Sequence, residues 1–378
     1  MTELTLEQPP QPEQPPMPIV QQGGKVVVKA NRIGYDGRLG DVYKIWLLNI
    51  FLTVITLGIY SFWGKTRMRR YVTGSFKLGG DHFEYTGTGK ELFIGFLKVF
   101  PFFLLVSFAL QYVPPELIIV IYLPVMYLIP VAIYMSARYR LNRLTWRGIR
   151  GRLTGSAFRY GGFALWRMFL NVVTLGILIP ASDIATYGYM MNRAGFGNIR
   201  AKFDGKSNGL IGIHIATLVG AAVAAGACFG LGGLLSAGAV AAMGSEAAAG
   251  GAAPAVGGIF FVCALLGVMS AVLIRSFYHA ALQREQMRGL TLGHVRFKFT
   301  GTGFDMFRLR LGNLLLVLLT LGLGMPVVIQ RSMRFMSKHV IIGGDLDSAE
   351  LMQAAREQGA VGEGLDDLLG LDAGFGIG

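Results

Sequence analysis

Cysteine and charge are both scarce in this chain of 378 residues. The two cysteines, Cys228 and Cys263, lie in apolar runs without a CxxC partner, so neither a disulfide framework nor a cysteine metal site is indicated. Charged residues make up 15% of the chain, 53% of the residues are apolar and the mean hydropathy is +0.50. Soluble domains carry about 25% charged residues. These values exclude an ordinary soluble domain and predict an integral membrane protein.

Groups of residues that carry out catalysis are also missing from the sequence. It holds no Ser/His/Asp set and no pair of carboxylates within an apolar run, and Thr86-Gly-Thr-Gly-Lys90 lacks the spacing of a P-loop. The five histidines lack the spacing of metal ligands, and His214, deep in an apolar run, is expected to be a hydrogen-bonded core residue. We therefore expect no enzymatic activity, no cofactor and no metal.

Basic residues outnumber acidic ones by 35 to 22, which gives a net charge of +13. They gather at the ends of apolar runs, an arrangement that suits anionic lipid headgroups. A nucleic-acid groove would instead need a soluble basic face. We therefore expect the lipid bilayer, with its anionic headgroups, as the partner and no nucleic acid, whereas the sequence carries no signal for the oligomeric state.

The stretch from Tyr43 to Gly80 returns near the C-terminus. A shift of 264 residues without gaps aligns Asn49 with Asn313, Thr56 with Thr320, Gly58 with Gly322 and Arg67 with Arg331. A weaker copy, at a shift of 118, repeats the Thr-Leu-Gly-Ile string at residues 174–177 but carries Asp183 and lacks the arginines. The sequence therefore predicts a threefold internal repeat of a broken helix, at about residues 43–80, 163–205 and 307–344.

The rest of the chain divides into two apolar hairpins, short strands and two tails. Transmembrane hairpins are predicted at about 94–137 and 210–274. Strands are expected on either side of each repeat, with hairpin turns at Gly79-Gly80 and at the Thr-Gly-Thr-Gly strings, where a strand ends and a helix starts. Residues 1–24, rich in Pro and Gln and without a signal-peptide core, are expected to be a disordered tail. Residues 25–345 would form the integral membrane domain, followed by an acidic tail, 346–378. The predicted fold is a mainly α-helical polytopic membrane protein with short β-strands between its helical segments.

Two arrangements of the repeats in the membrane remain open. If each repeat crosses once, the protein has seven spans, and the two sides of the membrane hold 16 and 18 Lys and Arg residues. Cytoplasmic loops of membrane proteins normally carry an excess of Lys and Arg. The even split therefore favours the second arrangement, in which each repeat is a re-entrant pair of limbs of about 10 residues, or about 15 Å, and both termini are cytoplasmic.

The strings YKIWLLNIFLTVITLGIYSFWGKTRMRRY and HFEYTGTGKELF resemble the YjgN family of bacterial inner-membrane proteins, a family defined as a domain of unknown function. The likeness covers about residues 25–345. Phe62 departs from the proline of that family, whereas Pro180 and Pro326 keep it. The resemblance implies a multi-pass protein of the bacterial inner membrane and supplies no chemistry.

Two groups of residues in the repeats are candidates for function. The first group either lines a polar pathway or only joins helices and marks the helix break: Asn49, Thr56, Gly58, Asn313, Thr320 and Gly322. The second group either binds anionic headgroups or only fixes the orientation of the helices in the membrane: Lys65, Arg67, Arg69, Arg70, Arg331 and Arg334.

Two functions of different class fit these features. One is a membrane protein that binds or transports a small solute or a lipid. The alternative is a structural or interaction protein that recruits a partner through its cytoplasmic strands or its acidic tail.

Overall fold

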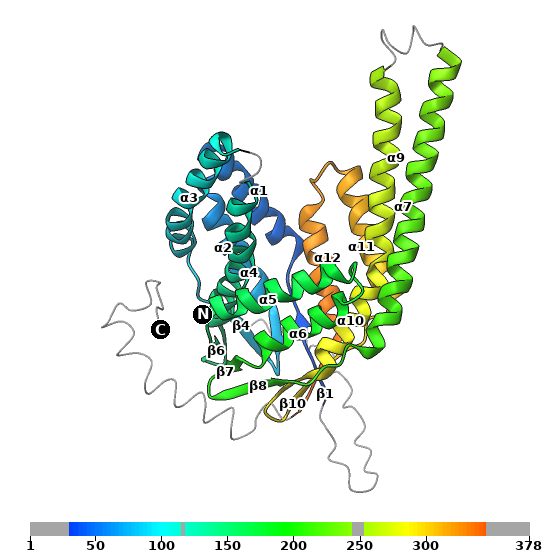
Figure 1. The fold of residues 1–378 in the computed structure, drawn as a ribbon. Coiled ribbons are helices and arrows are strands. Elements are labelled where there is room, and N and C mark those ends of the chain that lie inside the picture. The colour runs from blue at the N-terminus through cyan, green and yellow to red at the C-terminus, as the bar shows by residue number, and fades with distance from the viewer. Residues whose placement is uncertain (1–29, 115–117, 244–252, 345–378) are drawn as a thin grey trace, which may run out of the picture.

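The computed structural model describes residues 30–114, 118–243 and 253–344. The predicted tails, 1–24 and 346–378, lie outside these residues. The described part is mostly helical. Its strands gather at one end of the molecule, and the helices extend away from them (Figure 1).

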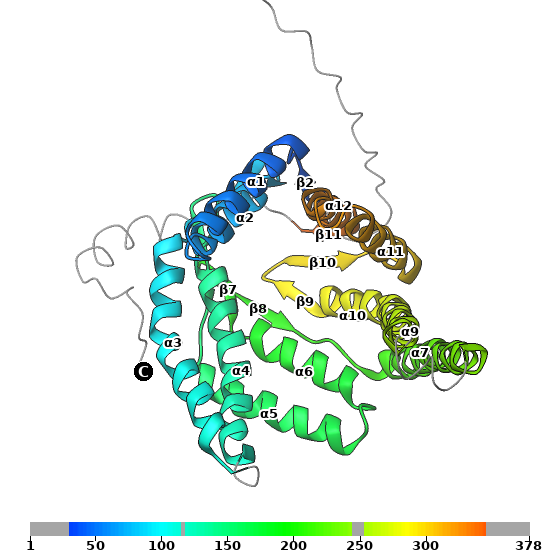
Figure 2. The same cartoon turned by 90° about the horizontal axis from the view of Figure 1, so that it is seen from above.

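One order of elements recurs five times along the described chain: a strand, a pair of helices and a returning strand. The bounds are β1 (Ala30–Arg32), β2 (Gly34–Tyr35), α1 (Leu39–Ile55), α2 (Ser61–Gly74), β3 (Phe76–Leu78), β4 (Asp81–Tyr85), α3 (Gly89–Tyr112), α4 (Ile118–Asn142), β5 (Leu144–Trp146), β6 (Ile149–Leu153), α5 (Ala157–Val173), α6 (Ile179–Met191), β7 (Ala194–Phe196), β8 (Ile199–Phe203), α7 (Asn208–Met243), α9 (Ala253–Ile274), α10 (Ser276–Gly289), β9 (Leu290–Leu292), β10 (Val295–Phe299), α11 (Gly303–Leu319), α12 (Met325–His339) and β11 (Val340–Gly343). In the fourth unit α10 continues α9 towards the sheet. Seen from above, the helix pairs surround the strands (Figure 2).

The strands form one antiparallel sheet in the order β1-β11-β10-β9-β8-β7-β6-β5-β4-β3-β2. The strands at the two ends of this order, β1 and β2, are separated in the chain by Ile33 alone. β1 pairs with β11, and β2 pairs with β3. The two ends of the strand order therefore lie next to each other in the chain, on either side of Ile33.

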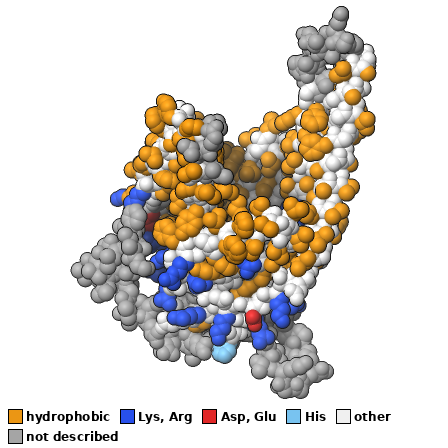
Figure 3. Space-filling view, viewed as in Figure 1, with side chains coloured by type: hydrophobic (Ala, Val, Ile, Leu, Met, Phe, Trp, Pro, Cys, Tyr) orange, Lys and Arg blue, Asp and Glu red, His pale blue; other side chains and the backbone are white. Residues whose placement is uncertain are grey.

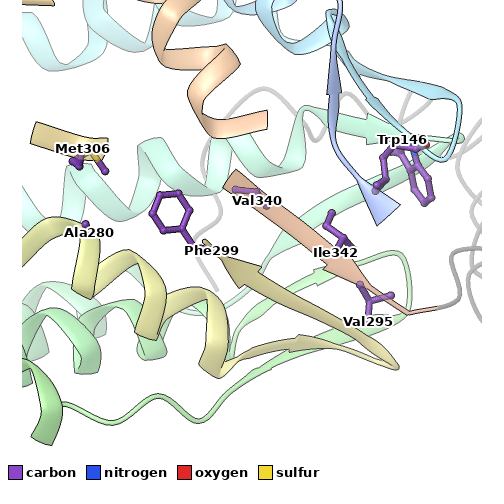
Figure 4. Close-up of a cluster of buried hydrophobic side chains, with 8 residues drawn as sticks. Trp146, Ala280, Val295, Phe299, Met306, Val340 and Ile342 are labelled. Atoms are coloured by element: carbon purple, nitrogen blue, oxygen red, sulfur yellow. The ribbon is translucent and has the colours of Figure 1, made fainter. Parts of the chain in front are cut away.

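One apolar cluster joins strands from all round the sheet. Leu78 of β3, Trp146 of β5, Val295 of β10 and Ile342 of β11 are buried together in it. The indole Nε1 of Trp146 donates a hydrogen bond to the Leu78 carbonyl oxygen at 3.3 Å. Figure 4 shows how Trp146, Val295 and Ile342 extend from their strands towards this core. The inner side of the sheet is thus filled by packed apolar side chains.

The Thr-Gly-Thr-Gly strings connect a strand to a helix, as predicted from the sequence, but the further prediction that they are hairpin turns of the sheet is wrong. Thr88 and Thr302 are the N-caps of α3 and α11, each in a reciprocal capping box with the acidic residue three positions later. A Cβ on Gly87 would lie 2.7 Å from the Tyr85 ring, and one on Gly301 would lie 2.6 Å from the Phe299 ring. Glycine is therefore needed for the close approach of the ring, and the capping threonine then starts the helix.

The three Thr-Leu-Gly strings form the loops between paired helices and share one backbone geometry. Leu57, Leu175 and Leu321 have φ angles of 48°, 49° and 49°, and each following glycine also has a positive φ. A left-handed leucine costs about 1–2 kcal/mol, so this loop is strained in all three places. Each loop reverses the chain, and the second helix of each pair returns to the sheet.

The helical limbs are longer than the predicted length of about 10 residues. In the first pair, α1 has 17 residues and α2 has 14. Both helices extend beyond the uncharged run at residues 45–64 into residues that carry charge. The prediction equated the helix with its apolar part, which was wrong, since charged residues such as Lys and Arg are good helix formers.

Four helical stretches are long and apolar enough to cross a membrane: Gly89–Tyr112, Val120–Asn142, Asn208–Ala242 and Gly257–Gly289. They overlap the segments predicted as transmembrane hairpins, 94–137 and 210–274, although the last stretch continues to Gly289. On the face shown in Figure 3, apolar side chains cover the helical part, and Lys and Arg gather near the sheet. The described structure is therefore that of a polytopic membrane protein.

Candidate functional site

The helix breaks satisfy their own polar groups. The hydroxyl of Thr56 donates to the Leu52 carbonyl oxygen at 2.7 Å and accepts from the Tyr60 amide at 2.9 Å. The hydroxyl of Thr320 does the same with the Leu316 carbonyl oxygen and the Gly324 amide, at 2.6 and 2.8 Å. The threonine thus caps both sides of the loop.

Gly58 and Gly322 lie at the same tips. A Cβ on either glycine would meet no atom within 4 Å, but the φ angles of +94° and +90° favour glycine. At these two positions glycine is required by the backbone conformation and not by a close neighbour.

Asn49 and Asn313 join the two helices of their pairs. The Asn49 Nδ2 donates to the Gly64 carbonyl oxygen at 3.0 Å, and the Asn313 Nδ2 donates to the Ser332 hydroxyl at 3.3 Å. In the middle pair the Ser182 hydroxyl donates to the Asn171 Oδ1 at 2.7 Å. The asparagines therefore act as links between helices, although Asn49 Oδ1 and Asn313 Oδ1 are buried and have no hydrogen-bond partner.

The six candidate basic residues lie on two helices, one on either side of α1. Lys65, Arg67, Arg69 and Arg70 belong to α2, and Arg331 and Arg334 belong to α12; α1 packs against both helices. Four of them are exposed, whereas Arg69 and Arg331 are partly buried. The Arg70 guanidinium donates to the Gly87 carbonyl oxygen at 3.2 Å. We call these six residues the basic collar.

A buried cluster of ionisable residues lies where α6, α7 and α10 meet. Tyr278 donates its hydroxyl proton to Asp183 Oδ2 at 2.6 Å. The Arg275 guanidinium stands 4.5 Å from the centre of the Tyr278 ring and 3.0 Å from His214 Nδ1. The other ring nitrogen of His214, Nε2, lies 3.0 Å from the carbonyl oxygen of Gly176.

This cluster fixes the middle helix pair in place. His214 and Tyr278 are fully buried. Because Gly176 belongs to the loop between α5 and α6, the contact with His214 attaches that loop to α7, and the Asp183 contact attaches α6 to α10. The expectation of a hydrogen-bonded core histidine at His214 is confirmed.

Sequence reasoning did not find the cluster as a site. It noted Asp183 only as a departure of the middle repeat, and it took no notice of Arg275 or Tyr278. The available signal was a single carboxylate in one apolar helix and an arginine directly after the run that ends at Ile274. Their pairing spans 95 residues of sequence, so it follows only from the packing of the helices.

Outside the membrane-spanning segments, two carboxylates are held in their charged form. Lys77 Nζ lies 2.7 Å from Asp36 Oδ2, and this hydrogen bond lowers the pKa of Asp36. Hydrogen bonds from the hydroxyl and amide of Thr302 lower the pKa of Asp305 in its capping box. Both carboxylates lie where a strand meets a helix pair, so they stabilise the junctions that orient the helices.

Residues 30–368 match the family model of a bacterial protein of unknown function, DUF898. The chain belongs to the DUF898 family. It is 25% identical over 358 residues to the inner membrane protein YjgN of Salmonella typhimurium, which covers 84% of this chain and 89% of that protein. It is 34% identical over 76 residues to YjgN of Escherichia coli O157:H7, covering 20% of this chain and 19% of that one.

No solved structure matches the chain. The names of the DUF898 relatives agree with the four apolar helices described above, and they assign no chemistry. The predicted membership of this family is therefore confirmed, and the site must be interpreted from its geometry.

Proposed function

We propose that this DUF898 protein is a multi-pass protein of the bacterial inner membrane that binds anionic phospholipids at the cytoplasmic face and has no enzymatic activity. The observation that carries the proposal is the shape of the three broken helix pairs. Both ends of each pair adjoin the sheet, whereas the tips expose leucine side chains. The exposed fractions of Leu57, Leu175 and Leu321 are 93%, 86% and 92%.

The length of the apolar tips fits insertion into one leaflet. The apolar part of α1, from Ile45 to Ile55, is about 16 Å long at 1.5 Å per residue, and the hydrocarbon core of a bilayer is about 30 Å thick. On α2, Lys65 lies four residues after Ser61, the first residue of this helix after the tip. A tip inserted to this depth brings the basic collar to the level of the lipid phosphates.

The charge distribution supports a cytoplasmic position of the sheet. Residues 30–344 carry 32 Lys and Arg against 11 Asp and Glu, and basic residues gather at the sheet end (Figure 3). The positive-inside rule then favours the cytoplasm for this end. With the sheet there, the described chain begins at β1 and ends at β11 on the cytoplasmic side, which supports cytoplasmic termini.

We infer that the three broken pairs are copies of one unit. Their shared loop geometry, their capping threonines and their matching sequence offsets support this. Copies placed round one sheet would insert three apolar tips into the same leaflet and so bind several lipid molecules at once.

Two observations favour a lipid over a dissolved solute as the ligand. The threonine groups at the breaks are already hydrogen-bonded, and apolar side chains fill the inner side of the sheet. A solute pathway would instead need polar groups that face water or the solute. A protein that recruits a partner through its cytoplasmic strands is the second candidate, because the strands carry exposed basic residues such as Arg200 and Arg296.

The proposal is tested by native mass spectrometry of the purified protein titrated with phosphatidylglycerol or phosphatidylcholine. We expect tighter binding of phosphatidylglycerol. Each basic residue near an anionic surface contributes about 1 kcal/mol, so replacing Arg67, Arg69 and Arg70 by Gln should weaken phosphatidylglycerol binding roughly 100-fold. The matched control replaces Arg200 and Arg296, on the outer face of the sheet, by Gln. Equal retention of both lipids by the parent protein would refute a preference for anionic lipid, and an unaffected collar variant would refute the role of the collar.

A further inference from the structure

Three long strands repeat one pattern of apolar and basic residues. The sequences are IRGRL in β6, IRAKF in β8 and VRFKF in β10. Side chains along a strand alternate between its two faces, so the two basic residues of each strand share the outer face. All six are exposed: Arg150, Arg152, Arg200, Lys202, Arg296 and Lys298. We call them the basic sheet face. The corresponding strand β4, DHFEY, has His82 and Glu84 at these two positions, so this face is confined to part of the sheet.

The register of the strands places these basic residues in rows. Lys202 and Arg296 both stand opposite Thr291 of the short strand β9. Arg152 and Arg200 both stand opposite Gly195 of β7. Small or short side chains thus separate the cations, which lie two strand spacings, or about 10 Å, apart.

Three cations of this face, Arg152, Arg200 and Arg296, form no ion pair with a carboxylate in the described part of the chain. Beside the face, a cavity of about 570 Å³ opens next to Lys202; its lining is of mixed charge, with Lys206 and Arg288 beside Asp204 and Glu285. The strands therefore offer the separated cations that suit an extended chain with several carboxylates, and the cavity adds no net positive charge to them.

We propose that the occupant of the basic sheet face is the C-terminal segment of this same chain, residues 345–378. This segment carries eight acidic residues and a single basic one, Arg356. The sheet leads directly into it, since Gly343 of β11 stands opposite Arg296 of the basic sheet face. Charge and connection both point to this segment.

The segment is long enough to cover the face. Its 34 residues reach at most about 110 Å at 3.3 Å per residue. The path from β10 to β6 crosses four strand spacings, or about 19 Å. Because the segment is tethered beside the face, its effective concentration there is on the order of 1 mM. The segment binds through side chains and not as an added strand, because β1 and β11 already pair with each other.

This inference goes beyond the proposed binding of lipids by the basic collar. The collar lies on the helices α2 and α12, whereas the basic sheet face lies on the strands at the opposite end from the apolar tips (Figures 1 and 3). Lipid binding at the collar and docking of the acidic segment can therefore fail independently.

The test uses a fluorescent peptide of residues 345–378 and two full-length proteins, the parent and a tail-neutralised variant in which the eight acidic residues of the segment are replaced by Asn or Gln. Binding is measured by fluorescence anisotropy. The neutralised protein should bind one peptide per chain, and added salt should weaken this binding. For a peptide Kd of about 100 µM, the tethered segment at about 1 mM should weaken peptide binding to the parent about tenfold.

Two matched double variants of the tail-neutralised protein locate the contact. Arg200→Gln with Arg296→Gln should weaken peptide binding at least tenfold, whereas Arg67→Gln with Arg70→Gln on α2 should leave it unchanged. Equal peptide binding by the parent and the neutralised protein would overturn the proposal, as would an unaffected Arg200 and Arg296 pair. Failure of the peptide to bind, with phosphatidylglycerol vesicles or transfer RNA bound at this face instead, would assign the face to another occupant.

Discussion

Replacing Tyr278 by Phe tests whether the buried cluster holds the middle helix pair in place. The substitution removes only the hydroxyl that donates to Asp183 Oδ2 at 2.6 Å. A hydrogen bond to a charged group contributes about 1.5–3 kcal/mol. Because Tyr278 is fully buried, water does not readily replace the lost donor. We therefore expect the free energy of unfolding to fall by about 2 kcal/mol.

A double-mutant cycle with Asp183→Asn separates this bond from other effects. Asp183→Asn keeps an oxygen that can accept from Tyr278 but removes the charge, so each single variant loses the charge-assisted part of the bond and the double variant loses it only once. The two single effects together should therefore exceed the double effect by about 1 kcal/mol, the difference between a charged and a neutral hydrogen bond. The free energy of unfolding is measured by titration with sodium dodecyl sulfate in mixed micelles. Tyr122→Phe, at a half-exposed tyrosine of α4, is the control. Additive single effects would refute the coupling of α6 to α10.

Three further changes have defined outcomes in the same unfolding assay. Thr320→Val removes both hydrogen bonds of the loop cap and should cost about 1–2 kcal/mol; no loss would refute the cap. Leu321→Gly should relieve about 1–2 kcal/mol of strain from the left-handed backbone. The greater flexibility of glycine in the unfolded chain should cost about 0.5–1 kcal/mol, so the free energy of unfolding should stay the same or rise slightly. A fall of about 2 kcal/mol would contradict an exposed tip. Asp305→Asn should destabilise the protein at pH 7. Because the folded pKa of Asp305 is lowered below its ordinary 3.8, its contribution is present above that pH and is lost as the pH falls further, so the parent and the variant should converge in acid.

The helix breaks were predictable because their cause is local. Thr-Leu-Gly repeats in sequence, and helices commonly end next to a glycine in the left-handed conformation. The lengths of the limbs were not predictable from the apolar run, since α1 begins at Leu39 and α2 ends at Gly74, both beyond it. The local sequence therefore predicts where the loop lies but not the lengths of the two helices that it joins.

The contacts that give the site its form depend on residues far apart in the chain. Trp146 meets Leu78 across 68 residues, and Gln330 donates to the Gly37 carbonyl oxygen across 293. The start of a helix at each Thr-Gly-Thr-Gly string was predictable, whereas the hairpin assignment was wrong because these glycines serve close packing against an aromatic ring. Pairings of this kind follow from the order of the strands, which no single stretch of the sequence encodes.

Cysteine accessibility in membrane vesicles tests the central claim, that the broken helix pairs enter and leave on one face. Single cysteines replace Gly40, Lys77 or Leu57 in a protein whose Cys228 and Cys263 are changed to Ala. Gly40 is exposed in the first turn of α1, Lys77 is partly exposed in β3 just after α2, and Leu57 is at the tip of the pair. A membrane-impermeant maleimide should label positions 40 and 77 from the cytoplasmic face only and should label position 57 from neither face. Labelling of positions 40 and 77 from opposite faces would contradict the account.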